Sequence, residues 1–431
     1  MRRFCTFLLA AIIFAAISSI TVAAVPDLSL ADAVYVYNTD SGLEVHSKNA
    51  DKLTPPASTV KLMTAIIAYE HYRGTFDTVI TVPEKAVDMT VGNNIGLVAG
   101  EEVTVDELLT ALIAGGANDA ANTFAIEIAG DLDSFCDMMN AKAAEIGAVN
   151  TVYKNASGID KEGMVTSAKD VALISAYAYK LSGFREYAGI TRYVMDATNK
   201  SKQRVIHNRN YLLSYHIEPK YYDSDAIGMN SGFTQEGGFC TVTAAESNGL
   251  TYIIVIMNAE KDDNGDNSSF YMASKLIDWA TSSFGYMTVL DPNTIVREVP
   301  VSLAKNVDYV IVSPQDKVEY FLPLSTDVST EITYKMRLDS DTLTAPIYEG
   351  QKVGNVDVEY KGKTIATVAL VTKNNVSAST ILRLLDYIKN LLKSSQVRIA
   401  IGIFVALFVS YLLLSYVQFR RMHKKNNNKR R

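Results

Sequence analysis

The chain has 431 residues, of which 48% are hydrophobic and 20% are charged, and its formal net charge at pH 7 is −6. This length suggests two domains. The excess of acidic side chains argues against binding to nucleic acid or another polyanion. The five histidines show no zinc-binding spacing, and the sequence has neither a phosphate-binding glycine-rich loop nor a Gly-x-Ser-x-Gly nucleophile elbow. We therefore expect no metal ion and no nucleotide cofactor.

The N-terminus has the layout of a secretory signal. Arg2 and Arg3 precede an uncharged apolar run, residues 4–17, and small residues follow up to Ala24. A basic start, an apolar centre and a small-residue end are typical of a signal peptide. We predict a signal peptide at residues 1–24, with an uncleaved membrane anchor as the alternative.

Ser58 and Lys61 form the most informative motif of the chain. They follow two prolines and open a helical run that extends to Tyr72, after a predicted β-hairpin at residues 34–46. Residues three apart on a helix face the same side, so the Ser58 hydroxyl and the Lys61 amine can touch. A lysine in a dry pocket loses its proton more easily, and a neutral amine can deprotonate a serine. The pair is therefore a candidate nucleophile that needs no histidine.

The Ser-x-x-Lys spacing alone is not specific. It recurs at Ser302 to Lys305, beside an alternating valine-rich run, where a strand would send the two side chains to opposite faces. We interpret that copy as accidental. Ser58 has its own alternative interpretation, because serine is favoured as an ordinary helix N-cap and Lys61 would then be a solvated side chain.

Several later segments decide in favour of a catalytic Ser58. Together with its motif they resemble the D-alanyl-D-alanine carboxypeptidases, the low-molecular-weight penicillin-binding proteins. The resemblance covers roughly residues 27–373. The matching segments lie at residues 108–121, 154–160, 207–213, 231–234 and 238–240.

The resemblance implies an α/β (α+β) fold of the penicillin-recognising serine enzymes, with an antiparallel five-stranded sheet and flanking helices at residues 27–288. Helical patterns at residues 105–113, 118–129 and 167–181, and a buried strand at 252–257, agree with this fold. Residues 293–373 change to short alternating segments and predict a small all-β domain. Its expected strands are residues 296–301, 309–312, 318–322, 328–336, 356–360 and 365–371.

Two family motifs are altered in this chain. The second, Ser-x-Asn, has Gly116 in place of the serine hydroxyl and keeps Asn118. The third, Lys-Thr-Gly, reads Asn230, Ser231 and Gly232, and so lacks the cation that would help to hold a substrate carboxylate. Losing the charged partner of a desolvated carboxylate costs about 2–5 kcal/mol. That cost corresponds to a factor of about 30 to several thousand.

The resemblance implies a serine-type carboxypeptidase acting on peptidoglycan stem peptides, with β-lactams as acylating inhibitors. Lys61 would take the proton of Ser58, and the backbone amides of Ser58 and Phe233 would form an oxyanion hole. Because Gly116 has no hydroxyl, the departing amine lacks the side chain that usually relays a proton to it. The implied substrate-binding residues are Asn118, Asn230, Ser231, Gly232, Phe233 and Thr234. Two alternatives stay open: a catalytically silent relative that binds cell-wall peptides, and an endopeptidase on cross-linked stems.

Three segments follow the all-β domain. Apolar residues at helical spacing predict an amphipathic helix at residues 377–394, on the bilayer surface or continuing into the span. Residues 399–417 are 19 residues without a charge, so we predict a transmembrane helix at residues 397–417. The tail, residues 418–431, holds seven cations and no acid, and positive residues stay inside. We expect a single-pass protein of the bacterial cell membrane with its catalytic domain outside the cytoplasm.

The exported part of the chain is strongly acidic. Without the two signal arginines and the seven tail cations, residues 25–417 carry a net charge of −15. Cys136 and Cys240 lie in this part. A disulfide between them is one reading, and two separately buried thiols are the reading we favour.

Overall fold

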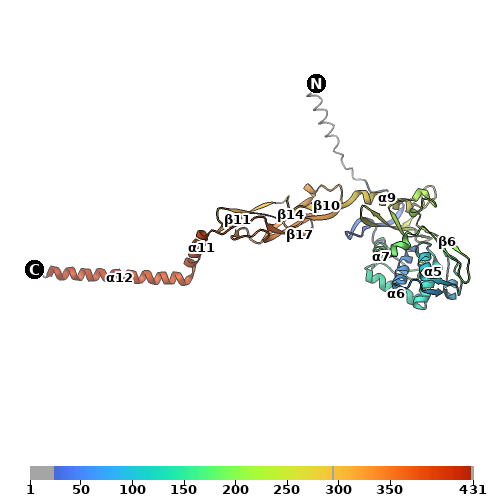
Figure 1. Cartoon of the computed structure of the whole chain (residues 1–431), viewed down its shortest axis with the longest axis horizontal. Coiled ribbons are helices and arrows are strands. Elements are labelled where there is room, and N and C mark those ends of the chain that lie inside the picture. The colour runs from blue at the N-terminus through green and yellow to red at the C-terminus, as the bar shows by residue number, and fades with distance from the viewer. Residues whose placement is uncertain (1–23, 294–295, 429–431) are drawn as a thin grey trace, which may run out of the picture. The chain divides into compact units, whose positions relative to one another are not determined.

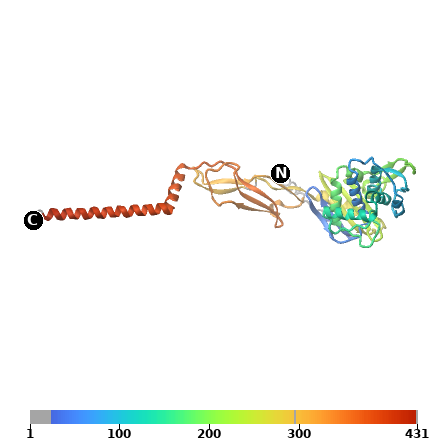
Figure 2. The ribbon, with the colours of Figure 1, turned by 90° about the horizontal axis from the view of Figure 1, so that it is seen from below.

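The computed structural model describes residues 24–293 and 296–428. The predicted signal peptide, except its last residue, lies outside the described residues. The chain divides into two compact units. The first extends to Gly285 and includes Phe321–Ser325, and the second comprises Tyr286–Tyr320 and the chain from Thr326 onward (Figures 1 and 2).

A five-stranded antiparallel sheet forms the centre of the first unit, as the sequence predicted. Its strand order is β2-β1-β9-β8-β7, which leaves β7 at one edge. The expected hairpin is confirmed as the β1–β2 pair. The bounds are β1 Ala31–Asn38, β2 Leu43–Lys48, β7 Ala226–Thr234, β8 Gly238–Ser247 and β9 Leu250–Ala259.

The side chains of strand β9 show that this sheet is covered on both faces. Residues 252–257 are all fully buried, as expected of a continuous apolar run in a central strand. Successive side chains point to opposite faces. Tyr252 and Ile254 accordingly pack with helix α9 (Ser268–Ser283), while Ile253 and Val255 join the larger core of the helical part.

Several helices of the first unit begin at polar caps. Helix α4 (Val105–Ile113) has a capping box, in which Thr104 and Glu107 bond each other's backbone amides. Ser167 caps α7 (Ala168–Lys180), and the bounds of α5 (Asn118–Ala129) match the predicted range. The other helices are α2 Val60–His71, α3 Glu84–Asp88, α6 Leu132–Ile146 and α8 Phe184–Gly189.

Short elements complete the first unit. Strands β3 (Val79–Thr81) and β4 (Glu102–Thr104) pair, as do β5 (Arg192–Met195) and β6 (Arg204–His207). Single 3-10 turns are η1 Ala57–Thr59, η2 Tyr211–Leu213 and η3 Pro219–Tyr221. Cys136 and Cys240 are free, separately buried thiols, and burial raises their pKa values to about 11 and about 12.

The second unit is built on a six-stranded sheet with the order β14-β16-β17-β12-β11-β15. Lys361 and Gly362, the predicted turn, join β16 and β17 with positive φ angles of 48° and 77°. The strands are β11 Arg297–Ser302, β12 Tyr309–Pro314, β14 Ile332–Leu338, β15 Leu343–Thr344, β16 Lys352–Tyr360 and β17 Lys363–Thr372. Two further strands, β10 Phe284–Leu290 and β13 Val318–Pro323, pair with each other.

One local prediction in this unit was wrong. The strand expected at residues 328–336 begins with a short helix, α10 (Val328–Glu331), because the Asp327 carboxylate accepts the Ser329 amide and caps a helical turn. No strand carries both Ser302 and Lys305 in the described chain. Strand β11 ends at Ser302, and Leu303 adopts a positive φ of 59°.

Two helices end the described chain. Helix α11 (Thr380–Lys393) is capped by Ser379 and has no buried residue. Helix α12 (Ser395–Asn428) includes Ser395–Met422, the one segment among the described residues that is long and apolar enough to cross a membrane. These elements fall where the sequence predicted an amphipathic helix and a span.

Candidate active site

Ser58 lies at the tight turn that leads into helix α2. The preceding Ala57 has a positive φ of 47°, which an L-residue adopts only at a cost of about 1–3 kcal/mol. The Thr59 hydroxyl donates to the Pro56 carbonyl at 2.6 Å and closes the turn. This geometry holds the half-buried Ser58 at the wall of a cavity while the residues on either side of it are buried.

Lys61 is the buried partner of Ser58. Its side chain is 2% exposed, and its Nζ lies 3.1 Å from Ser58 Oγ and 2.5 Å from the Ser157 carbonyl oxygen. Burial, and next the nearby positive charge of Arg209, lower the pKa of Lys61 to about 7. A large part of the Lys61 population is therefore neutral near pH 7 and able to accept the proton of Ser58.

The loop at residues 155–158 packs closely against the turn that carries Ser58. Asn155 Oδ1 accepts the backbone amides of Ser157 and Gly158, and Thr64 on α2 donates to the Ala156 carbonyl at 2.7 Å. A Cβ on Gly158 would lie 2.0 Å from the Ala57 carbonyl oxygen, so only glycine allows this approach. The loop thereby fixes the carbonyl that holds Lys61.

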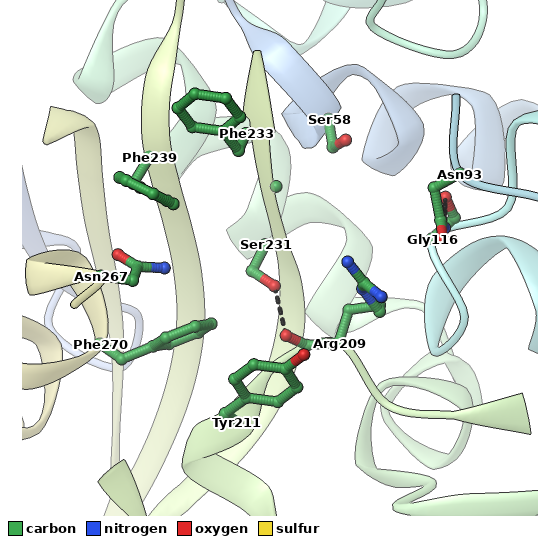
Figure 3. Close-up of a pocket in the computed structure, with 11 residues that line it drawn as sticks. Ser58, Asn93, Gly116, Arg209, Tyr211, Ser231, Phe233, Phe239, Asn267 and Phe270 are labelled. Atoms are coloured by element: carbon green, nitrogen blue, oxygen red, sulfur yellow. Dashed lines mark hydrogen bonds between the residues drawn. The ribbon is translucent and has the colours of Figure 1, made fainter. Parts of the chain in front are cut away.

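Gly232 brings the edge strand β7 to the nucleophile. A Cβ on Gly232 would lie 2.4 Å from both Cβ and Oγ of Ser58. The neighbouring Ser231 donates its hydroxyl to the Arg209 carbonyl at 2.6 Å (Figure 3). Strand β7 and the chain before η2 therefore meet beside Ser58.

Asn118, from the second motif, starts helix α5 beside the cavity. It is 3% exposed, and its Nδ2 donates to the Val91 carbonyl at 2.5 Å. Its Oδ1 and the Oδ1 of Asn230 are buried and have no hydrogen-bond partner within the described residues. Gly116, the motif's first position, has a positive φ of 63°.

Most of the predicted site residues line one cavity of about 390 Å³. Ser58, Gly116, Ser231, Gly232 and Phe233 line it, and Lys61 reaches it through its bond to Ser58. Asn118, Asn230 and Thr234 are not among its lining residues. Asn230 is 3% exposed, and the Thr234 hydroxyl instead accepts the Gly237 amide in the β7–β8 turn.

The sequence reasoning missed six further residues of the cavity wall. Phe239 and Phe270 lie across β7 from Asn93 and Gly116, so one wall is largely aromatic and the other polar (Figure 3). Phe233 and Phe239 pack against each other, with ring centroids 4.6 Å apart. The missed residues are Asn93, Arg209, Tyr211, Phe239, Asn267 and Phe270.

Arg209 is the missed residue with the clearest chemical meaning. Its exposed guanidinium points into the space between Ser231 and Gly116 (Figure 3). The flanking Asn208 and Asn210 are buried and bond to neighbouring backbone, and the Arg209 amide donates to the Ala114 carbonyl at 2.9 Å. The order Asn-Arg-Asn at residues 208–210 is the signal that the sequence offers, because alternate side chains of an extended segment point to opposite sides. The segment was matched as a whole, without assigning a role to its cation.

Metal chemistry has no support in the described part of the chain. No group of three or more His, Cys, Asp or Glu side chains there is arranged to hold a metal ion. The cavity wall presents the Ser58 hydroxyl, to which the Lys61 amine is bonded, and the Arg209 guanidinium.

A family model described as D-alanyl-D-alanine carboxypeptidase matches residues 20–261, more than half of the chain. The chain belongs to the D-alanyl-D-alanine carboxypeptidase family. A second model, described as the penicillin-binding protein 5 C-terminal domain, matches residues 284–378. The resemblance drawn from the motifs is confirmed.

Individual relatives agree with the family assignment. The chain is 27% identical over 346 residues to the D-alanyl-D-alanine carboxypeptidase DacF of Bacillus subtilis, covering 78% of this chain and 83% of the relative. It is 28% identical over 348 residues to DacC of Escherichia coli, with 78% and 82% covered. The crystal structure of DacD from Francisella tularensis shares the fold, with 24% identity, a TM-score of 0.62, and 83% and 95% of the two chains covered.

Proposed function

We propose that this chain is a serine-type D-alanyl-D-alanine carboxypeptidase that removes the terminal D-alanine of peptidoglycan stem peptides. The observation that carries the proposal is the 3.1 Å contact between Ser58 Oγ and a buried Lys61 amine whose pKa is about 7. Membership of the family, and the names of the relatives, supply the substrate class.

The reaction proceeds in two steps. Neutral Lys61 takes the proton of Ser58, and Oγ attacks the carbonyl carbon of the penultimate D-alanine. The backbone amides of Ser58 and Phe233 stabilise the oxyanion, and such donors are each worth about 3–4 kcal/mol. The terminal D-alanine leaves, and water hydrolyses the acyl-enzyme. Lys61 or an ordered water protonates the leaving amine, since Gly116 has no hydroxyl.

Other predicted residues hold the substrate in this proposal. Ser231, Gly232 and Thr234 belong to the strand along which the stem peptide lies. Asn118 does not line the cavity, but its buried Oδ1 has no hydrogen-bond partner among the described residues. In this proposal it accepts a substrate N–H once the peptide enters, which would satisfy a group that otherwise costs about 1–3 kcal/mol. Asn230 contributes no charge.

We further propose that Arg209 supplies the cation that Asn230 lacks. Its guanidinium lines the same cavity as Ser58 and Ser231, and no carboxylate within the described residues forms an ion pair with it. The backbone bonds on both sides of Arg209 hold the base of its side chain in place. A substrate carboxylate is the partner that such a charge favours.

Substitution of Arg209 tests this role. We expect Arg209→Gln to lower kcat/KM for D-alanyl-D-alanine peptides by roughly 10- to 100-fold, the usual worth of a hydrogen bond to a charged group. Asn230→Lys should change the wild-type rate less than about threefold but restore activity to Arg209→Gln, because it returns a cation. Equal activity of Arg209→Gln and the wild type would mean that the carboxylate binds elsewhere.

The reaction itself is tested by product analysis. The full-length protein in detergent is incubated with linear and with cross-linked stem peptides, beside Ser58→Ala. Release of D-alanine from linear stems by the wild type alone supports the proposal. Cleavage restricted to cross-linked stems would make the protein an endopeptidase. No product from a folded protein would make it a silent relative that binds cell-wall peptides.

The cellular setting is part of the proposal. We propose that β-lactams acylate Ser58, and that α12 anchors the protein once in the bacterial cell membrane with the catalytic unit outside. The apolar side chains of α11, such as Leu384 and Ile388, are exposed to an extent that suits a bilayer surface. Protease added to right-side-out vesicles should digest the catalytic unit and spare the basic tail.

A further inference from the structure

Asn93 stands beside the altered second motif. It lies in the connection between α3 and β4 and lines the catalytic cavity. Its Nδ2 donates to the carbonyl oxygens of Gly115 at 2.8 Å and Gly116 at 2.7 Å. Its own backbone carbonyl accepts the amide of Asn118 at 2.8 Å. The side chain is therefore bonded to Gly116, the position that lacks the hydroxyl, and to the residue before it.

The loop that carries Asn93 is itself held in place. The buried Asp119 carboxylate accepts the backbone amides of Ile95 and Leu97, which follow Asn93 in the same loop. A Cβ on Gly116 would lie 3.5 Å from Asn93 Nδ2. Asn93 thus sits next to the space that a serine side chain at position 116 would occupy.

The hydrogen bonds fix the orientation of the Asn93 amide. Only the NH₂ group can donate to two carbonyl oxygens, so Oδ1 is the opposite end. No described residue donates a hydrogen bond to Oδ1. An oriented acceptor therefore remains free at the wall that also carries Gly116.

We propose that Asn93 Oδ1 accepts a hydrogen bond from the N–H of the leaving amine and so holds the leaving group in place of the missing motif hydroxyl. The inference rests on the carboxypeptidase function proposed above. Asn93 becomes a catalytic residue by direct contact with the scissile nitrogen. An amide oxygen carries no proton, so Asn93 cannot replace the hydroxyl as a proton relay.

The proton balance assigns the relay to Lys61. The bond between Ser58 Oγ and the carbonyl carbon forms, and the Ser58 proton moves to Lys61 Nζ. The carbon–nitrogen bond then breaks, and the Lys61 ammonium returns that proton to the leaving nitrogen. Asn93 holds the N–H already present on the nitrogen, so the lone pair develops on the side away from Asn93 and receives the proton.

Three acylating compounds separate this role from a structural one. A D-alanyl-D-alanine peptide has an N–H on its leaving nitrogen. A D-alanyl-D-lactate depsipeptide has an ester oxygen there, and the β-lactam nitrogen of a penicillin carries no hydrogen. The proposed hydrogen bond exists only for the first compound, whereas a distorted loop would slow all three.

The experiment compares full-length wild type with Asn93→Ala. We expect kcat/KM for the peptide to fall by about 10-fold, the worth of one neutral hydrogen bond. The depsipeptide and the penicillin acylation rate should change by less than about twofold. The ratio of peptide to depsipeptide kcat/KM is independent of the folded fraction, so partial unfolding of the variant does not obscure the result.

Asn94→Ala is the matched control. Asn94 lies in the same loop, bonds only within it, to the Gly92 carbonyl and the Gly96 amide, and does not line the catalytic cavity. Its peptide-to-depsipeptide ratio should equal that of the wild type. An equal loss on all three compounds by Asn93→Ala, or no loss at all, would overturn the role of Asn93. A wild type that penicillin acylates but that releases no D-alanine would overturn the carboxypeptidase proposal itself.

Discussion

The same four-residue spacing, Ser-x-x-Lys, occurs in each unit of this protein with different results. In the first unit, Lys61 is 2% exposed and lies 3.1 Å from the Ser58 hydroxyl at the start of a helix. In the second unit, Ser302 ends a strand and bonds to the Leu343 carbonyl, while Lys305 is exposed in a loop. The difference teaches that helical geometry and burial of the amine, rather than the spacing, make a serine reactive.

The largest contrast is expected from the two serines. Ser58→Ala should abolish the mass gain of one penicillin molecule, because the attacking oxygen is gone. Ser302→Ala should keep the full adduct. Intact-mass measurement of the full-length protein after incubation with a penicillin checks both variants. An adduct on Ser58→Ala that Ser302→Ala lacks would reverse the assignment.

The two lysines give the next contrast. Lys61→Met should slow acylation by about 10²- to 10⁴-fold, the usual contribution of a general base. Lys305→Met should leave the rate unchanged, since Lys305 is exposed in a loop and does not line the catalytic cavity. Stopped-flow acylation with a chromogenic cephalosporin measures both rates. Comparable losses in the two variants would refute the distinction.

A pH profile sharpens the comparison. Because the pKa of Lys61 is about 7, its base form is lost as the pH falls through 7. The acylation rate should therefore drop about tenfold per pH unit below pH 6 and level off above pH 8. Arg209→Gln should move the midpoint upward, because the positive charge of Arg209 lowers the Lys61 pKa. A profile flat from pH 5 to 8 would contradict Lys61 as the base.

Stability gives the smallest contrast. The unfolded chain binds a proton on Lys61 between pH 7 and its ordinary pKa of 10.5, and the folded chain does not, so the stability contribution of Lys61 rises with pH across this window. Lys61→Met should stabilise the protein at pH 7 by about 1 kcal/mol or more, and less at pH 10. Lys305→Met should stay within about 0.5 kcal/mol at both pH values. Denaturant titration is the measurement, and a destabilised Lys61→Met would show that its hydrogen bonds outweigh its burial.

Much of the fold followed from local patterns in the sequence. The hairpin, the bounds of α4 and α5, and the buried strand β9 depend on alternation, caps and apolar runs that neighbouring residues determine. The strand expected at 328–336 failed for the same local reason, since Asp327 can cap a helical turn. Ser58 and Lys61 could be paired because one helical turn separates them.

The rest of the site depends on distant segments meeting. Asn93, Arg209 and Phe270 come from three separate parts of the chain and line one cavity only after the sheet and helices pack. Asn230 was placed in the site by its motif position, yet its side chain is buried and does not line the cavity. The spacing of residues within one segment does not tell which distant segments will line the same cavity.

Two glycines of the cavity differ in how far they tolerate substitution. Any side chain at Gly232 would overlap Ser58, because an added Cβ would lie 2.4 Å from its Cβ and Oγ, so a change there would displace the nucleophile itself. At Gly116 the nearest atoms to an added Cβ are 3.5 and 3.6 Å away, and only the positive φ resists substitution. Substitutions that leave the nucleophile in place are therefore expected to be tolerated at position 116 rather than at position 232.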